Sequence, residues 1–450
     1  MFFLLSATPD AAAHVPAATN ATGSTAEHLV VTLLLQLVVL LVVTRAIIWV
    51  GRRFFGQTDV VGEMLAGVVL GPSVLGALHP EAMHALFAPI TGPVFVGVSQ
   101  VGLIFLMFQI GLEFELQREL SQGKKRILVL SLTSILVPFV LGFATAEFFR
   151  VRSPLPDGTF PPSLAFRLFF GTAMSITAIP VLGRIFMELG LGKTRTAALT
   201  IGAAAINDVV GWLLLGLVSA IIGAKLAPGP LVLKLGLIAL YGVFMLKLAR
   251  PLLVRFVRAS MAREKGLGPG LLSWSCIALF GSAIVTSKLG IFAILGGFVL
   301  GLSLQSEHAF AEAWKAKVSP LVQAFFLPLF FAYTGLRTEI GELHGPSAWL
   351  ECGLICLVAF AGKFGGTYFA ARALGEPNRT AVTLGVCMNT RGLMELIALN
   401  VGYDLGVLPK RTFTMLVIMA IVSTFVATPA IRRLMATERR IAPEEGVELT

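Results

Sequence analysis

The chain has 450 residues, of which 56% are hydrophobic and 13% are charged. Soluble domains contain roughly 25% charged residues, so this composition excludes an ordinary soluble domain. The chain also contains 33 Phe and 46 Gly, which suit lipid-facing surfaces and close helix packing, respectively. We therefore predict an all-α polytopic membrane protein.

The formal net charge of +10 raises the question of a nucleic-acid partner. The Lys and Arg residues gather in short segments between apolar stretches, which is a topology signal, so no nucleic acid is expected. The four cysteines lie inside apolar segments, where neither a disulfide framework nor a thiolate metal site is expected. The histidines lie in expected loops without a third ligand, so we expect no metal site and no cofactor.

Residues 1–28 are expected to form a mobile tail without a cleaved signal peptide, because a basic start and a long apolar core are missing. A bilayer core of about 30 Å needs roughly 20 apolar residues per helix, and thirteen segments meet this criterion. The expected spans are 30–50, 58–76, 94–113, 126–148, 165–187, 196–222, 230–249, 270–288, 289–304, 318–337, 347–372, 378–402 and 411–434.

The distribution of basic residues predicts the orientation of these spans. Most of them fall on one side, for example in 52–53, 124–126, 255–265 and 432–440. Cytoplasmic loops carry the excess of Lys and Arg, so we expect the N-terminus outside and the short tail 436–450 in the cytoplasm. We expect a bacterial inner (plasma) membrane as the location.

The two halves of the chain repeat each other. Leu65–Gly71 in the first half and Leu295–Gly301 in the second share a pattern of small residues. A second pair of matching positions follows further along each half, with Gly111 in the first half and Gly335 in the second. Repeats that lie seven spans apart run in opposite directions through the bilayer. Inverted repeats of this kind are typical of secondary transporters. The alternative is a gene duplication that only builds a stable helix bundle. The expected units are repeat one, a linker helix and repeat two, at 30–222, 230–249 and 270–434.

The span 165–187 carries Thr172, Ser175, Thr177 and Pro180 near mid-bilayer. Proline lacks an N–H and its ring clashes with the carbonyl four residues earlier, so we expect the helix to open near Pro180. The freed carbonyls and the hydroxyls of Ser175 and Thr177 can then ligate a cation. The alternative is a simple kink whose hydroxyls bond back to the preceding turn.

The span 378–402 is interrupted in the same way at Asn389, Thr390, Arg391 and Gly392. Two interrupted helices at equivalent repeat positions point to the substrate site of a transporter. Arg391 and Glu395 lie four residues apart on one helix face. We interpret them as a structural ion pair, which is the least costly way to keep both charges inside a membrane.

One acid, Asp208, lies near the centre of the otherwise apolar span 196–222, directly after Asn207. A charged side chain at the bilayer centre costs at least about 2.5 kcal/mol, so ionisable residues there are usually functional. We predict that Asp208 binds the transported ion and the proton, and that Asn207 bonds across the site and holds the carboxylate.

Lys363 supplies the opposite charge inside the glycine-flanked part of span 347–372. An ammonium at this depth needs a carboxylate or a cage of carbonyls, and snorkelling to the interface is the alternative. By repeat symmetry we expect Lys363 to face Asp208 where the interrupted helices cross. Glu113, at the cytoplasmic end of span 94–113, is either a gate or an interfacial charge.

These residues are suited to exchange rather than to covalent chemistry. A proton and a metal cation can compete for one carboxylate. If the carrier changes access only when it is loaded with either ligand, obligatory exchange results.

The chain resembles the monovalent cation:proton antiporter-2 family, and within it is similar to plant cation/H+ exchangers and their bacterial relatives. The resemblance covers about residues 28–435. It is carried by Leu65–Gly76, Gly111–Glu113, Thr177–Pro180, Ala205–Asp208, Gly362–Lys363, Asn389–Gly392 and Glu395–Ile397.

The resemblance implies a sodium/proton antiporter-like fold with two crossed discontinuous helices, over a transmembrane domain at 29–435. It implies a dimerisation domain, hence a homodimer in the lipid bilayer, and a six-helix core that moves past it. Asp208 would bind K+ or Na+ and H+, Lys363 would be its charge partner, and Thr177 would line the unwound segment. Asn207 replaces a second aspartate of electrogenic members, which favours electroneutral one-for-one exchange, although proton release from Lys363 would restore electrogenicity.

Three other functions compete with antiport. A sodium-coupled organic-anion symporter of similar inverted fold would use Arg391 and a wide apolar cavity beside the crossing, whereas exchange needs a narrow aqueous funnel ending at Asp208. A gated channel predicts much faster currents. An enzyme is least favoured, because no nucleophile, histidine base or metal cluster sits in a pocket position.

Overall fold

The computed structural model describes residues 19–57, 59–87, 92–113, 124–177, 182, 185–186, 194–223, 228–289 and 293–435. Every regular element in these ranges is helical, as expected. Ten of these helices are long and apolar enough to cross a membrane, and the apolar helix α14 (Ala293–Leu304) is shorter. The two other expected spans, 165–187 and 378–402, are the interrupted ones, so the count of thirteen is still a prediction.

The helices form two packing groups, which we call the outer group and the core group. The outer group contains α1 (Thr19–Val50), α2 (Asp59–Leu70), α5 (Gly92–Glu113), α11 (Pro228–Val243), α12 (Arg250–Glu264), α13 (Pro269–Lys288), α14 and α17 (Leu327–Leu336). Shorter helices connect them, namely α3 (Leu75–Leu78), α4 (Pro80–Leu86), α15 (His308–Lys317) and α16 (Ser319–Leu321).

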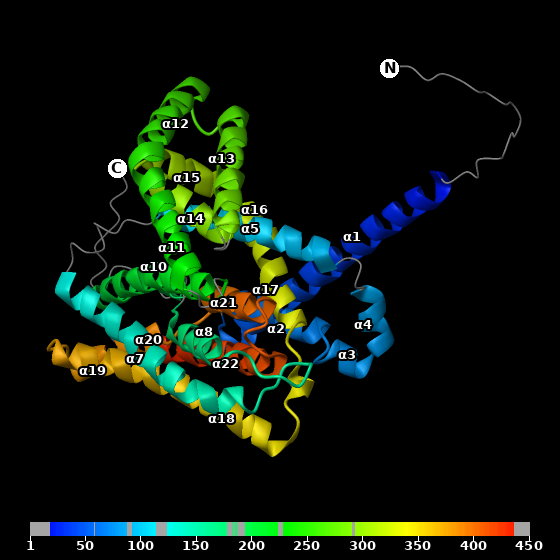
Figure 1. Cartoon of the computed structure of the whole chain (residues 1–450), viewed down its shortest axis with the longest axis vertical. Helices are drawn as coiled ribbons and strands as arrows, with labels where there is room; N and C mark the ends of the chain where they lie inside the picture. Colours follow the sequence, from blue (N-terminus) through cyan, green and yellow to red (C-terminus); the bar gives the residue numbers. More distant parts are fainter. Residues whose placement is uncertain are drawn as a thin grey trace, which may run out of the picture.

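The core group contains α7 (Lys124–Arg150), α8 (Ser163–Ser175), α10 (Arg195–Gly223), α18 (Gly345–Phe360), α19 (Gly366–Ala373), α20 (Asn378–Met388), α21 (Leu393–Asp404) and α22 (Lys410–Met435). Figure 1 shows the core group in the lower part of the molecule, with α12, α13 and α15 above it. Helices α2, α11 and α17 of the outer group contact the core group through α22, α10 and α21, respectively. Stacked rings of Phe149, Phe166 and Phe170 fill the space between α7 and α8.

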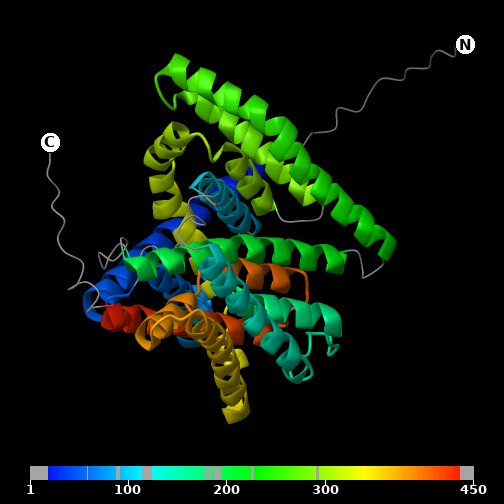
Figure 2. The same cartoon turned by 90° about the vertical axis from the view of Figure 1, so that its left-hand side faces the viewer.

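Two element boundaries differ from those expected. Helix α1 begins at Thr19, inside the expected tail, while residues 1–18 and 436–450 lie outside the described residues. The linker helix does not end at residue 249: α11 continues through the π-helical turn η3 (Phe244–Ala249) into α12 and ends at Glu264. The wider turn comes just before Pro251, where it relieves the clash of the proline ring with the preceding turn. Figures 1 and 2 show α11 and α12 as one long rod beside α13.

The glycines of the repeated motifs lie where helices cross. A Cβ on Gly67 of α2 would lie 2.0 Å from a backbone oxygen of α17, and one on Gly335 of α17 would lie 2.5 Å from a backbone oxygen of α2. The corresponding distances are 2.4 Å for Gly111 of α5 against α14 and 2.2 Å for Gly301 of α14 against α5. The first helix motif of each half thus packs against the second motif of the other half. An inverted repeat would produce this exchange of partners, and the inversion itself is still a prediction.

Candidate functional site

The first interrupted helix, α8, ends before Pro180. Its last helical residue is Ser175, and Ile176 has an extended backbone with φ −77° and ψ 144°. Thr177 follows without regular structure, whereas Pro180 lies outside the described residues. The helix therefore ends inside the core group, where its last four carbonyls lack intrahelical partners.

The second interruption lies between α20 and α21, at residues 389–392. The N–H of Asn389 donates to the carbonyl of Val386 at 3.2 Å. The hydroxyl of Thr390 donates to the carbonyl of Cys387 at 2.8 Å. Asn389 and Thr390 are both buried, so the break that the sequence predicts is present, and it lies in the interior of the core group.

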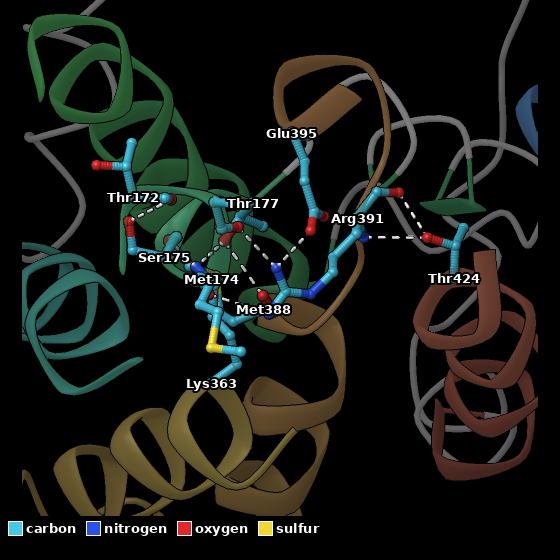
Figure 3. Close-up of polar contacts among 10 residues, drawn as sticks. Thr172, Met174, Ser175, Thr177, Lys363, Met388, Arg391, Glu395 and Thr424 are labelled. Carbon is cyan, nitrogen blue, oxygen red and sulfur yellow. Dashed lines mark hydrogen bonds and ion pairs between the residues drawn. The ribbon is translucent and has the colours of Figure 1, made fainter. Parts of the chain in front are cut away.

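The guanidinium of Arg391 lies across the end of α8 (Figure 3). Its Nη1 donates to the carbonyl of Ala173 at 3.1 Å, and its Nη2 donates to the carbonyl of Met174 at 3.0 Å. Nη1 also donates to Oε1 of Glu395 at 3.0 Å, and both charged side chains are buried. Because the C-terminus of a helix carries partial negative charge, a cation is stabilised there. The ion pair expected from the sequence therefore also ties α21 to α8.

Lys363 reaches the same helix end from the π-helical turn η6 (Ala361–Gly365). Its Nζ donates to the carbonyl of Ser175 and, at 2.5 Å, to Oγ1 of Thr177. Thr177 in turn donates to the carbonyl of Met388 at 3.2 Å, which joins the two breaks. Lys363 is 0% exposed, so the snorkelling alternative is wrong: protein oxygens replace the hydration of its ammonium.

All four carbonyls at the end of α8 accept side-chain hydrogen bonds, because Ser175 Oγ also donates to the carbonyl of Thr172 at 2.8 Å. The carbonyls that seemed free from the sequence for a transported cation are thus bonded to protein groups. The functions of Ser175 and Thr177 as cation ligands are still predictions.

Asp208 lies halfway along α10 and is 3% exposed. Helix α10 packs against α7, α8 and α20, so this buried residue lies on a helix that contacts helices next to both breaks. Its neighbour Asn207 is fully buried and donates from Nδ2 to Oγ of Ser134 on α7 at 2.8 Å, and Ser134 donates to the carbonyl of Ser131. Asn207 therefore anchors α10 to α7 beside Asp208.

Four of the buried charged side chains in the core group, two of each sign, are Asp208, Lys363, Arg391 and Glu395. The pairing of Lys363 with Asp208 is still a prediction. Among the described residues, no group of three or more His, Cys, Asp or Glu is arranged to hold a metal ion.

Some residues were missed by sequence reasoning or are not placed by the structure. Thr424 of α22 bonds to the backbone of Arg391, and Ser134 holds Asn207. Each is one of several Ser and Thr residues in an apolar helix, so no sequence pattern distinguishes it from its neighbours. Glu113 is the last residue of α5, and its side chain lies outside the part of the chain that can be described.

Comparison with known proteins now adds to this geometry. The chain matches the family described as sodium/hydrogen exchanger, transmembrane, over residues 21–437. It is 40% identical over 402 residues to "Na(+)/H(+) antiporter NhaS4" of Synechocystis sp., a similarity that covers 89% of this chain and 97% of that protein. It is 36% identical over 87% of its length to "Cation/H(+) antiporter 20" of Arabidopsis thaliana, of which it spans only 48%.

The fold also resembles a solved structure. The sodium proton antiporter MjNhaP1 from Methanocaldococcus jannaschii has a TM-score of 0.61 over 94% of this chain and 99% of that chain. The sequences are 15% identical, so this likeness concerns the fold alone. Together, the family match and the cyanobacterial relative show that the chain belongs to the sodium/hydrogen exchanger family of transmembrane proteins.

Proposed function

We propose that the protein is a secondary active transporter that exchanges a monovalent cation, Na+ or K+, for H+ by alternating access. The observation that carries this proposal is Asp208, a buried carboxylate halfway along α10, beside two interrupted helices. Buried ionisable residues inside membranes mark ion pathways and proton relays. The names of the relatives above, which describe sodium or cation antiport with protons, support the same class of substrate.

The ionic partners at the crossing favour a one-for-one exchange. Glu395 is paired with Arg391, and Asn207 is neutral, so Asp208 is the carboxylate proposed to bind the exchanged ions. One proton or one monovalent cation adds the same charge to it. Both loaded forms of the carrier then have equal net charge, and the exchange is electroneutral. If Lys363 lost a proton during the cycle, this equality would fail.

Two amide oxygens are candidates for further cation ligands. Oδ1 of Asn207 and Oδ1 of Asn389 are buried and accept no hydrogen bond within the described part of the chain. Hard cations prefer oxygen ligands of this kind. We propose that one of them joins Asp208 around the bound ion, together with the predicted ligands Ser175 and Thr177.

The symporter alternative is not supported by the similarities to known proteins. Arg391, which would bind an organic anion, has both terminal nitrogens bonded to Ala173, Met174 and Glu395. An apolar cavity of about 270 Å³ exists, but its lining comes from α5, α12, α13 and α14 in the outer group rather than from the crossing.

Proton flux in proteoliposomes tests the proposed exchange. Purified protein is given imposed Na+, K+ or Li+ gradients while a trapped dye reports internal pH. We expect cation-driven proton flux in the wild type, its loss in Asp208→Asn, and its retention in the matched variant Asp157→Asn, which changes an exposed loop carboxylate. Undiminished flux in Asp208→Asn would overturn the proposal. Flux that responds to an imposed membrane potential would overturn the electroneutral stoichiometry.

The remaining parts of the proposal concern the setting of the transporter. We propose that it works as a homodimer in a bacterial inner membrane, with the N-terminus outside and the C-terminus in the cytoplasm, and that it performs no covalent catalysis. The positive-inside distribution of Lys and Arg supports this orientation.

A further inference from the structure

A single hydroxyl group holds the backbone of the second break. Thr424 lies on α22 and is 2% exposed. Its Oγ1 accepts a hydrogen bond from the N–H of Arg391 at 3.1 Å and donates to the carbonyl of the same residue at 2.5 Å. Figure 3 shows both contacts, with Thr424 on the side of Arg391 opposite to α8. One side chain therefore satisfies the donor and the acceptor of one residue.

The neighbouring residues of the break obtain their hydrogen bonds from the two half-helices. The N–H groups of Asn389 and Thr390 donate into the last turn of α20, and the carbonyl of Gly392 accepts from Leu396 in α21. Arg391 lies between these two sets, and its backbone bonds to α22 instead. Unsatisfied backbone groups inside a membrane protein are costly, so this contact has a strong influence on the shape of the break.

We propose that Thr424 is a positioning residue of the exchange reaction. It fixes the backbone of Arg391, which carries its guanidinium to the carbonyls of Ala173 and Met174. Arg391 shares the end of α8 with Lys363, which bonds to the carbonyl of Ser175 and holds Thr177 at the other break. Thr424 touches neither the cation nor the proton in this scheme. The inference rests on the proposed exchange and identifies what keeps its site in shape.

The expected effect follows from the population of the competent site. Without the hydroxyl, the break samples other arrangements, and only a fraction of carriers presents the binding geometry. The apparent affinity for the cation is then the intrinsic affinity multiplied by the competent fraction. A saturating concentration of the cation restores the competent form. Each net hydrogen bond corresponds to a roughly three- to tenfold change in an equilibrium, and the Thr424 hydroxyl makes two, so we expect the KM of Thr424→Val for the cation to rise by at least about threefold. The maximal rate per folded molecule should change little.

A series of substitutions separates positioning from simple stability. Thr424→Ser keeps the hydroxyl, Thr424→Cys weakens it as a donor and acceptor, and Thr424→Val removes it while preserving the shape. Thr428→Val is the matched control. Thr428 lies one turn along α22 and is also buried, and its hydroxyl donates at 3.2 Å to the backbone carbonyl of Thr424 in its own helix rather than to the break. Initial rates of cation-driven proton flux are measured against cation concentration in proteoliposomes, and folded protein is quantified by size-exclusion chromatography.

We expect the KM to increase in the order Ser, Cys, Val, and the Thr428→Val control to keep the wild-type KM. If Thr424→Val does not accumulate as folded protein, the difference between the Ser and Cys variants decides. Equal KM values across the series, or an equal change in the Thr428 control, would overturn the positioning role. Failure of the proposed function would look different, because the wild type itself would then show no cation-driven flux.

Discussion

Removal of the Arg391 guanidinium tests whether the buried ion pair and the helix cap act as one unit. In Arg391→Met, Glu395 keeps its carboxylate in a site that is 1% exposed but loses its cationic partner. The carbonyls of Ala173 and Met174 lose their donors at the same time. Adding Glu395→Gln to this variant removes the negative charge of Glu395, which would otherwise be left without a cationic partner.

The free energies can be worked out from these contacts. Breaking a buried pair by removing one partner costs about 3–5 kcal/mol, chiefly because the other charge is left uncompensated. Leaving buried carbonyls without donors costs about 1–3 kcal/mol. The double variant, Arg391→Met with Glu395→Gln, keeps only the second cost. It should therefore be more stable than Arg391→Met alone by about 3–5 kcal/mol, a strongly non-additive result.

Thermal denaturation of the purified variants in detergent gives the measurement. We expect the lowest Tm for Arg391→Met and a partial recovery in the double variant. Arg258→Met is the control, since Arg258 is 67% exposed and pairs with Glu307 at the surface, so its loss should cost at most about 1 kcal/mol. A double variant that is no more stable than Arg391→Met would refute the argument from the uncompensated charge.

Two further predictions concern Lys363 and the helix crossing of α2 with α17. Lys363→Ala leaves the Ser175 carbonyl without its donor, so it should lower the Tm or shift the pH profile of proton flux; two unchanged curves would remove Lys363 from the site. Gly67→Ala places a Cβ 2.0 Å from a backbone oxygen and should destabilise the protein by about 1–3 kcal/mol through overpacking. In Gly97→Ala the new Cβ meets no other segment of the described chain within 4 Å, so its Tm should not fall. Equal losses in the two glycine variants would contradict the close crossing.

Much of the fold and part of the site can be read from the sequence, because the membrane imposes simple rules. A span needs a long apolar segment, and buried charges stand out against it. Asp208, Lys363 and the pair of Arg391 with Glu395 are identifiable for this reason. The interruption at residues 389–392 is visible because polar residues and glycine break an apolar run.

The partners of these groups could not be predicted in the same way. The sequence predicts that α8 opens near mid-bilayer, but the donors to three of its four terminal carbonyls come from residues about 190 to 220 positions further along the chain. Local patterns carry no information about such distant contacts. The extension of α12 to Glu264 was missed for a related reason, since its many arginines read as a loop although their helical spacing is compatible with an exposed helix.

The sequence by itself determined that this is a helical membrane protein with an acid and a base buried in opposite halves and two interrupted helices. These properties follow from the hydrophobicity of each segment and from the free-energy cost of placing a charge in lipid. Both can be assessed for each residue without knowing which distant residues it contacts. Only the tertiary structure decided that Arg391 and Lys363 cap the end of α8, and that Thr424 holds the second break. Hydrogen bonds require atoms within about 3 Å of each other, and packing of the whole core group is what brings such distant residues together.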